Sequence, residues 1–405
     1  MSSAGRIGIR PDSDPRRWAM LALVGVAELL GMSLWFTATA VSEELGARWS
    51  LSPGQIGWLA TSVNLGFVAG TAVAAVLNLA DIVPSRVYFA AAAVLAALAN
   101  AAVVLTAGFG QAVGLRFATG FLLAGVYPPA MKMAATWFRA ARGLAIGTIV
   151  GALTVGKATP YLLKALPAAG PEQVVVGASI GALLGAAMVA LFYRDGPFPF
   201  SRRPFSWGLV GTVLRHRETR LATGGYLGHM WELYAMWAWV PVFLAASSEA
   251  AGSGHDWVEL ASFGALAAGG LGCVLGGWAA DRIGRERLVI QCMAVSGLCC
   301  VAIGFLYGEA FLLVAAATLV WGFFVVADSA QFSALVTEVA PAGAAGTALT
   351  LQTCLGFLLA AATIQAVPVV AAVAGWAWAF AFLAFGPAAG IVAIRRFRRL
   401  RAGGG

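Results

Sequence analysis

The sequence has little charge. Acidic and basic residues together make up 11% of the chain, whereas soluble domains carry about 25%. Hydrophobic residues make up 60%, and the mean hydropathy is +0.84. A length of 405 residues would otherwise suggest two or three soluble domains, but this composition excludes an ordinary soluble protein. It indicates a protein that crosses a membrane several times.

Motifs for catalysis, nucleotide binding and metal binding are also missing. No glycine-rich stretch ends in Gly-Lys-Ser/Thr, and no Ser–His–Asp arrangement is visible. The cysteines show neither metal-ligand spacing nor a disulfide framework, and we expect them to pack as small apolar residues: Cys273, Cys292, Cys299, Cys300 and Cys354. The sequence therefore predicts a protein that is not an enzyme and holds no cofactor.

Long apolar segments fill most of the chain. A helix needs roughly 20 apolar residues to cross the hydrocarbon core, and twelve segments are near or above that length. Their approximate limits are 18–41, 55–79, 87–107, 110–136, 142–166, 173–193, 220–246, 257–280, 287–307, 310–336, 343–367 and 371–394. Backbone groups in lipid must be satisfied within the chain, so we predict an all-α membrane protein with twelve transmembrane helices.

Arginine marks one side of the predicted membrane protein. It occurs in the tails and the even-numbered loops: Arg6, Arg10, Arg16, Arg17, Arg86, Arg139, Arg194, Arg202, Arg203, Arg215, Arg217, Arg282, Arg285, Arg395, Arg396, Arg398, Arg399 and Arg401. The odd-numbered loops are mostly acidic. By the positive-inside rule both termini face the cytoplasm, and we expect a multi-pass protein of the bacterial cytoplasmic (inner) membrane. The net charge of +8 then reflects topology and contact with the lipid bilayer, not nucleic-acid binding.

Several landmarks recur about half a chain length apart. Glu28-Leu29-x-x-Met32-x-x-Trp35 returns as Glu232-Leu233-x-x-Met236-x-x-Trp239, Asp81 matches Asp281, and Gly143 matches Gly346. The repeats predict two pseudo-symmetric six-helix bundles. We expect an N-terminal tail (1–17), a first bundle (18–193), a linker with one surface helix at 206–216 (194–219), a second bundle (220–394) and a basic tail (395–405).

The loop after the eighth segment carries a recognisable motif, Gly277-Trp-Ala-Ala-Asp281-Arg282-Ile-Gly284-Arg285-Glu286-Arg287. It resembles the Gly-x-x-x-Asp-Arg-x-Gly-Arg-Arg loop of the major facilitator superfamily. Arg116-x-x-x-Gly120, and Pro128-Pro129 followed by Trp137-Phe138, resemble other motifs of the family. The resemblance implies two bundles that rock about a central site on spans 1, 4, 7 and 10. It also implies gating loops with Asp81, Asp281, Arg282, Gly284 and Arg285.

Charged residues inside the spans are the strongest functional signal. Each costs on the order of 3 kcal/mol near the midplane and should face a cavity or a partner. Three carboxylates are candidates for proton coupling: Glu28, Glu232 and Asp328. The alternative for the glutamates is a permanent ion pair with Arg116 or Lys157. Asp328 is equally well interpreted as a gate residue near the cytoplasm.

Further candidates for the substrate cavity are Trp35, Arg116, Lys132, Lys157, His229, Trp239 and Gln331. The chain has only three lysines, all in or beside apolar spans. Lys157 could attract an anion or pair with a carboxylate, and snorkelling is the alternative for it and for Lys132 and Lys164. His229 could relay protons with Glu232 or be a satisfied buried histidine.

These features predict a secondary transporter that works by alternating access as a monomer. A proton gradient is the expected drive, with symport of a small polar or organic solute. The substrate class stays open between a small polar metabolite, a weak organic acid and a drug that is exported by proton antiport. A transport-inactive receptor or sensor on the same fold is the alternative from another class.

Overall fold

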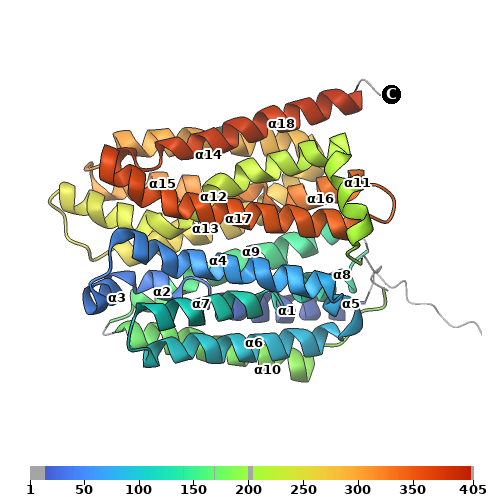
Figure 1. The fold of residues 1–405 in the computed structure, drawn as a ribbon, viewed down its shortest axis with the longest axis horizontal. Helices are drawn as coiled ribbons and strands as arrows, with labels where there is room; N and C mark the ends of the chain where they lie inside the picture. The colour runs from blue at the N-terminus through green and yellow to red at the C-terminus, as the bar shows by residue number, and fades with distance from the viewer. Residues whose placement is uncertain (1–13, 140, 168, 199–203, 403–405) are drawn as a thin grey trace, which may run out of the picture.

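The structure is a computed structural model that describes residues 14–139, 141–167, 169–198 and 204–402. Throughout these ranges the regular elements are helices, which run side by side along the longest axis (Figure 1). This arrangement confirms the predicted all-α fold. Arg6, Arg10, Arg202 and Arg203 lie outside the described residues.

The described part of the N-terminal half contains eleven helical elements. In chain order they are α1 (Arg16–Met32), α2 (Thr37–Ala40), α3 (Ser42–Trp49), α4 (Pro53–Val76), α5 (Leu79–Ile82), α6 (Ser85–Ala101), η2 (Ala102–Leu105), α7 (Phe109–Leu123), α8 (Tyr127–Ala135), α9 (Arg142–Lys164) and α10 (Pro171–Phe192). Two predicted spans are broken: 18–41 at residues 33–36, and 110–136 at residues 124–126. Chain breaks inside a membrane protein must satisfy their free backbone groups against protein, so these breaks can be sites for polar side chains.

A short surface helix, α11 (Trp207–Arg215), precedes the C-terminal half, close to the predicted limits of 206–216. The remaining elements are α12 (Arg217–Ala250), α13 (Val258–Ile283), α14 (Arg285–Phe305), α15 (Phe311–Ala327), α16 (Ser329–Val339), α17 (Ala345–Ala374), η3 (Trp376–Trp378), η4 (Ala381–Ala384) and α18 (Phe385–Ala402). The predicted span 310–336 is broken at Asp328, between α15 and α16. Helix α18 continues through the stretch expected to be a basic tail.

Ten helical segments of the described chain are long and apolar enough to cross a membrane. Of the twelve predicted spans, the two that do not meet this measure correspond to α1 and α12. Helix α1 has 17 residues before its break, and α12 has 34 residues that include several charged and polar side chains. Helix α1 is therefore too short for this criterion because of its break; α1 carries Glu28 and α12 carries Glu232.

The two halves repeat the same packing pattern. In the first, α1 packs on α9 and α10, α4 on α7, and α6 on α10; in the second, α12 packs on α17 and α18, α13 on α15, and α14 on α18. The correspondence extends to glycine contacts, because a Cβ on Gly120 would meet the Val63 carbonyl and one on Gly322 the Ala265 carbonyl. Each half therefore has the architecture expected for a duplicated bundle.

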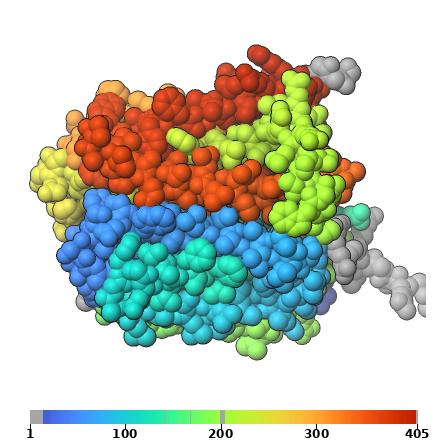
Figure 2. Space-filling view, in the orientation of Figure 1, coloured from blue at the N-terminus to red at the C-terminus, as the bar shows by residue number. Residues whose placement is uncertain are grey.

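Two helix pairs join the halves, α9 with α13 and α4 with α17. Figure 2 shows α4 and α17 in direct contact along one face. On α9 and α13 the backbones meet at glycines, because a Cβ on Gly151 would lie 2.9 Å from the Gly270 carbonyl oxygen. Small residues allow such close approach in membranes, and α9 carries glycines four residues apart at Gly147 and Gly151.

The two ends of the molecule differ. Helices α5, α8 and α11 and the C-terminus of α18 gather at one end, and α3 lies at the other (Figure 1). We call the first the arginine-rich end, because the described parts of the even-numbered loops and the end of α18 lie there, and the second the α3 end. The arginine-rich end is the one that the sequence predicts to face the cytoplasm.

Candidate functional site

The ammonium of Lys157 lies among aromatic rings from both halves. Its Nζ donates to the Tyr234 hydroxyl and lies 3.7 Å from the ring centroid of Trp35, 4.6 Å from that of Tyr234 and 5.4 Å from that of Trp237. Lys157 is on α9 and Trp35 is in the turn after α1, whereas Tyr234 and Trp237 are on α12. Lys157 is only 1% exposed, so its ammonium does not snorkel to either surface.

Phe67 on α4 and Phe357 on α17 extend this aromatic cluster. The ring centroids are 5.2 Å apart for Trp35 and Phe67, 4.7 Å for Phe67 and Phe357, and 4.9 Å for Phe357 and Tyr234. Such distances are typical of stacked and edge-to-face pairs. These two residues could not be predicted from the sequence, because a phenylalanine in an apolar span looks the same whether it lines a site, packs in the core or faces lipid.

Several buried polar atoms around the cluster have no hydrogen-bond partner within the described chain. They are both carboxylate oxygens of Glu28, the indole nitrogens of Trp35 and Trp237, and both side-chain polar atoms of Asn64. Asn64 lies one helical turn before Phe67 on α4, so the two share a face. Buried polar groups are normally paired, and unpaired ones indicate a functional demand.

Glu28 is fully buried on α1. The α1 and α9 backbones touch beside it, because a Cβ on Gly156 would lie 2.3 Å from the carbonyl oxygen of Leu29. The Lys157 ammonium of α9 lies within electrostatic range of the Glu28 carboxyl but does not hydrogen-bond to it. The permanent ion pair considered as an alternative is therefore absent from this conformation.

Arg116 hydrogen-bonds to the break in the first span, between α1 and α2. From α7 its guanidinium donates to the carbonyls of Leu34 and Trp35, to the Thr37 hydroxyl at 3.0 Å and to the Asn100 amide oxygen at 2.6 Å. The carbonyls belong to the turn between α1 and α2, where the helix leaves them free. Arg116 thus supports the chain beneath Trp35 from a fully buried position and does not itself reach the aromatic cluster.

Glu232 lies inside the C-terminal bundle and is well paired. Its carboxylate accepts from Ser296 at 3.0 Å, from Cys300 at 3.2 Å and from the Trp321 indole. These donors are on α14 and α15, so Glu232 points away from the N-terminal half. The two glutamates of the repeated tetrad occupy corresponding helices but do not face one another across one cavity.

His229 pairs with Asp328 and Ser329, not with Glu232. Its Nδ1 lies 3.0 Å from the Asp328 carboxylate, close enough for an ion pair but outside good hydrogen-bond alignment, and its Nε2 lies 2.9 Å from the Ser329 hydroxyl. Asp328 is the break between α15 and α16, and Ser329 is the first residue of α16. The histidine therefore joins α12 to this break, and the proposed relay with Glu232 has no hydrogen bond in the structure.

The gating-loop candidates lie at the arginine-rich end. Gly284 alone links α13 to α14, with φ of +89° that favours glycine. Arg285 donates to Gln331 at 2.8 Å and Glu338 at 3.0 Å, both on α16, which ties Gln331 to the loop instead of the centre. Arg282 lies 3.5 Å over the Trp278 ring.

Asp281 reaches across to the other half. Its Oδ2 lies 3.8 Å from the point that a Cβ on Gly143 would occupy, at the start of α9. A helix N-terminus attracts a carboxylate, so this contact suits a closed gate. Asp81 lies on α5, where the chain takes an additional turn after Asn78, and Lys132 donates from α8 to the Ala80 carbonyl of that turn.

Trp239 also has a packing role. Its indole donates to the Ile364 carbonyl of α17 at 2.8 Å, and its ring approaches Gly57 of α4. Beside it Gln365 donates to Thr61 across the halves at 2.9 Å. Of the predicted cavity residues, the structure brings Trp35 and Lys157 together and places Trp239 at the α4–α17 contact.

An ion pair that joins the halves lies at the α3 end. The Lys164 ammonium lies 3.2 Å from Glu44 on α3 and 3.8 Å from Glu259 at the start of α13. Glu44 belongs to the same half as Lys164, and Glu259 to the other. Sequence analysis did not connect these residues, because pairing between distant loops leaves no periodic signal.

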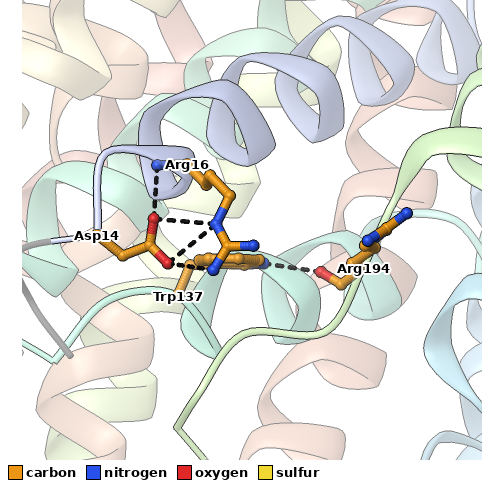
Figure 3. A network of polar contacts seen from close by, with 4 residues as sticks. All are labelled: Asp14, Arg16, Trp137 and Arg194. Atoms are coloured by element: carbon orange, nitrogen blue, oxygen red, sulfur yellow. Dashed lines mark hydrogen bonds and ion pairs between the residues drawn. The ribbon is translucent and has the colours of Figure 1, made fainter. Parts of the chain in front are cut away.

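The start of α1 is tied down at the arginine-rich end (Figure 3). Asp14 accepts from the backbone nitrogen of Arg16 at 2.9 Å and from its guanidinium at 2.8 Å, which lowers the pKa of the Asp14 carboxyl. Close by, the Trp137 indole donates to the Arg194 carbonyl at 2.9 Å. The Asp14–Arg16 contacts are local to the start of α1, whereas the Trp137–Arg194 bond joins the chain after α8 to the chain after α10.

Comparison with known proteins identifies the family. The structure is similar to the crystal structure of a bacterial homolog of the human lysosomal transporter Spinster in an inward-facing and unoccupied conformation. The TM-score is 0.70, the sequence identity 14%, and the match covers 96% of this chain and 98% of the other. No curated protein matches the sequence, and no cluster of metal ligands occurs among the described residues. The sequence profile described as Major Facilitator Superfamily matches residues 21–364, and the chain therefore belongs to this superfamily of membrane transporters.

Proposed function

We propose that this protein is a proton-coupled secondary transporter, a symporter that moves a small organic solute by alternating access. The two halves rock about the aromatic cluster between α1, α9 and α12. Glu28 carries the proton. The observation that supports this role best is the full burial of Glu28 with both carboxylate oxygens unpaired.

The chemistry of an unpaired buried carboxyl explains the assignment. Burying its charged form without donors is far more costly than burying its neutral form, so the closed state favours a bound proton. When the bundles open, water can solvate the carboxylate and the proton can leave. Proton binding is thereby linked to the side on which the site opens.

Glu232 does not meet this requirement. Three donors already stabilise its carboxylate, so its charged form does not depend on solvent access. Asp328 lies against His229 at a helix break and fits the gate role better than the coupling role. We therefore reduce the three coupling candidates to Glu28.

The proposed orientation places the arginine-rich end in the cytoplasm of a bacterial cell, with the protein in its cytoplasmic membrane and acting as a monomer. The arrangement of the even-numbered loops at one end supports it (Figure 1). Protease or thiol-reagent accessibility of a C-terminal tag in right-side-out vesicles tests the orientation. Reaction from outside the vesicles would contradict it.

Uptake into proteoliposomes tests the proposed coupling. A panel of labelled organic acids, amines and neutral metabolites is offered with and without an imposed pH gradient. We expect one class to accumulate only with the gradient. The Glu28→Gln variant should lose this accumulation but keep exchange of the same compound across the membrane, because the amide cannot release a proton.

Glu232→Gln is the matched control, since it makes the same change on the corresponding helix and should keep gradient-driven accumulation. Unchanged accumulation by Glu28→Gln would contradict the proposed coupling. Binding without transport by the unmodified protein would instead support the receptor alternative.

A further inference from the structure

We propose that the transported solute is an organic monoanion, whose carboxylate binds Lys157 and the free indole N–H groups of Trp35 and Trp237. Its apolar part lies against the aromatic cluster. This inference deepens the transport function proposed above and rests on it.

The ammonium of Lys157 has no counter-ion beside it within the described chain. Lys157 is buried, and none of the ion pairs found within the described chain includes it. The partners of its ammonium within the described chain are a neutral hydroxyl and aromatic faces. Rings attract a cation, but they do not replace the solvation that a buried ammonium loses. The site lacks one negative charge beside this nitrogen.

The second argument comes from the donors. The indole nitrogens of Trp35 and Trp237 are buried and unpaired, and both rings contact the same ammonium. An indole N–H and an ammonium can only donate. The two indole N–H groups have no acceptor, and the ammonium has only the Tyr234 hydroxyl. These donors favour a ligand that accepts hydrogen bonds, and a carboxylate accepts several at once.

An organic cation fits this place poorly. The aromatic surface that would hold it is already occupied by the Lys157 ammonium, and the two like charges would repel one another at short range. A cation would also leave both indole N–H groups unpaired. Only Glu28 favours a cation, and that carboxyl is the group expected to carry the proton.

The number of charges favours a monoanion over a dianion such as a phosphate ester. Arg116 is the other buried cation nearby, but its guanidinium is used by the turn between α1 and α2. With Glu28 protonated, Lys157 is the cation that faces the aromatic cluster. One monocarboxylate then neutralises this cation and the proton neutralises Glu28, which suits passage through a closed state.

Binding would also act on the contact between the halves. Lys157 belongs to the N-terminal half and Tyr234 to the C-terminal half, and their hydrogen bond is part of the closed arrangement. A carboxylate competes with the tyrosine hydroxyl for the same ammonium. Tyr234 is therefore expected to oppose binding, whereas Lys157 supports it.

Isothermal titration calorimetry on the purified full-length protein in detergent tests the proposal at pH 6. The probes are benzoate and butyrate as monoanions, phenyl phosphate as a dianion, benzylammonium as a cation and benzyl alcohol as a neutral analogue. We expect saturable binding of the monocarboxylates only. The tryptophan fluorescence should change on binding, because the ligand enters beside Trp35 and Trp237.

Three variants distinguish the role of each group. Lys157→Gln should weaken monocarboxylate binding by about tenfold or more, and Lys157→Arg should restore part of it. Tyr234→Phe keeps the ring but removes the competing hydroxyl, so binding should become tighter. Arg215→Gln removes a positive charge from the exposed surface helix α11 and should leave the affinity unchanged.

The proposal is wrong if no monocarboxylate binds, if benzylammonium binds instead, or if Lys157→Gln keeps the affinity while Tyr234→Phe binds no more tightly. Failure of the transport function looks different. In that case monocarboxylates bind with the expected variant pattern, but none accumulates in proteoliposomes under a pH gradient. Gradient-driven uptake of an amine would keep the transport function and overturn the monoanion.

Discussion

Three hydrogen-bond donors surround the carboxylate of Glu232, and none found within the described chain reaches that of Glu28. The Glu232 carboxylate is stabilised by these donors in any conformation of its own bundle. The charged form of Glu28 is stabilised only when water or a ligand reaches it. The hydrogen-bond donors around each carboxyl therefore decide which of the two can exchange a proton.

The Glu232→Gln variant tests this distinction through stability. The amide would place an N–H₂ group against donors that need an acceptor, so we expect the variant to lose about 1–3 kcal/mol of stability. Thermal unfolding in detergent measures the loss. Glu28→Gln has no hydrogen bond to lose and should unfold at the same temperature or higher. Equal destabilisation of both variants would contradict the donor argument.

The sequence could identify the buried charges but not their partners. Helical periodicity places Glu28, Met32 and Trp35 on one face, and the structure does bring Trp35 to Lys157. Periodicity does not say which neighbouring helix that face meets. Arg116 and Gln331 were both expected to line the cavity. In the structure Arg116 instead hydrogen-bonds to the turn between α1 and α2, and Gln331 accepts a hydrogen bond from Arg285.

At the scale of helices, α9 has two contact faces built from glycines. Gly147 and Gly151 face α13 of the other half, whereas Gly156 faces α1 of its own half. Glycines spaced by four along a span allow close helix approach, but the spacing does not say which helix approaches. The breaks between α1 and α2, α7 and α8, and α15 and α16 could not be predicted, because apolar composition continues through them.

Two alanine substitutions distinguish the roles of these two contact faces of α9. In Gly156→Ala the new Cβ would lie 2.3 Å from the Leu29 carbonyl oxygen, so α1 and α9 must move apart beside Glu28 and Lys157. We expect a loss of about 1–3 kcal/mol in stability and weaker substrate binding. Thermal unfolding and calorimetry measure the two effects.

Gly147→Ala is the control on the same helix. Its Cβ would lie 3.5 Å from the Cys273 carbonyl oxygen, an ordinary contact, so stability and binding should be preserved. If the two alanine variants behaved alike, the close contact of α1 with α9 would not be what positions Glu28 and Lys157.

At the scale of the whole molecule, contacts between the halves occur at the centre and at both ends. Asp281 approaches the start of α9 at the arginine-rich end, Lys157 meets Tyr234 at the centre, and Lys164 approaches Glu259 at the α3 end. Alternating access requires that the contacts of one end break while those of the other persist. The duplication visible in the sequence predicted the two bundles, but only the fold shows which side chains join them.

The ion pair at the α3 end gives the last prediction. Glu259→Gln removes the attraction between Lys164 and the other half, and the population open at the α3 end should rise by roughly twofold, since partly exposed pairs contribute about 0.5 kcal/mol. Hydrogen–deuterium exchange should become faster in α3 and in the first turn of α13. Glu172→Gln breaks the Arg48–Glu172 pair, which lies at the same end but within one half, and should leave the exchange of the first turn of α13 unchanged. Equal effects of both variants would show that the pair across the halves has no special part in closing this end. Faster exchange confined to Glu259→Gln would mean that closure depends on a contact between the halves, which is the property that alternating access demands.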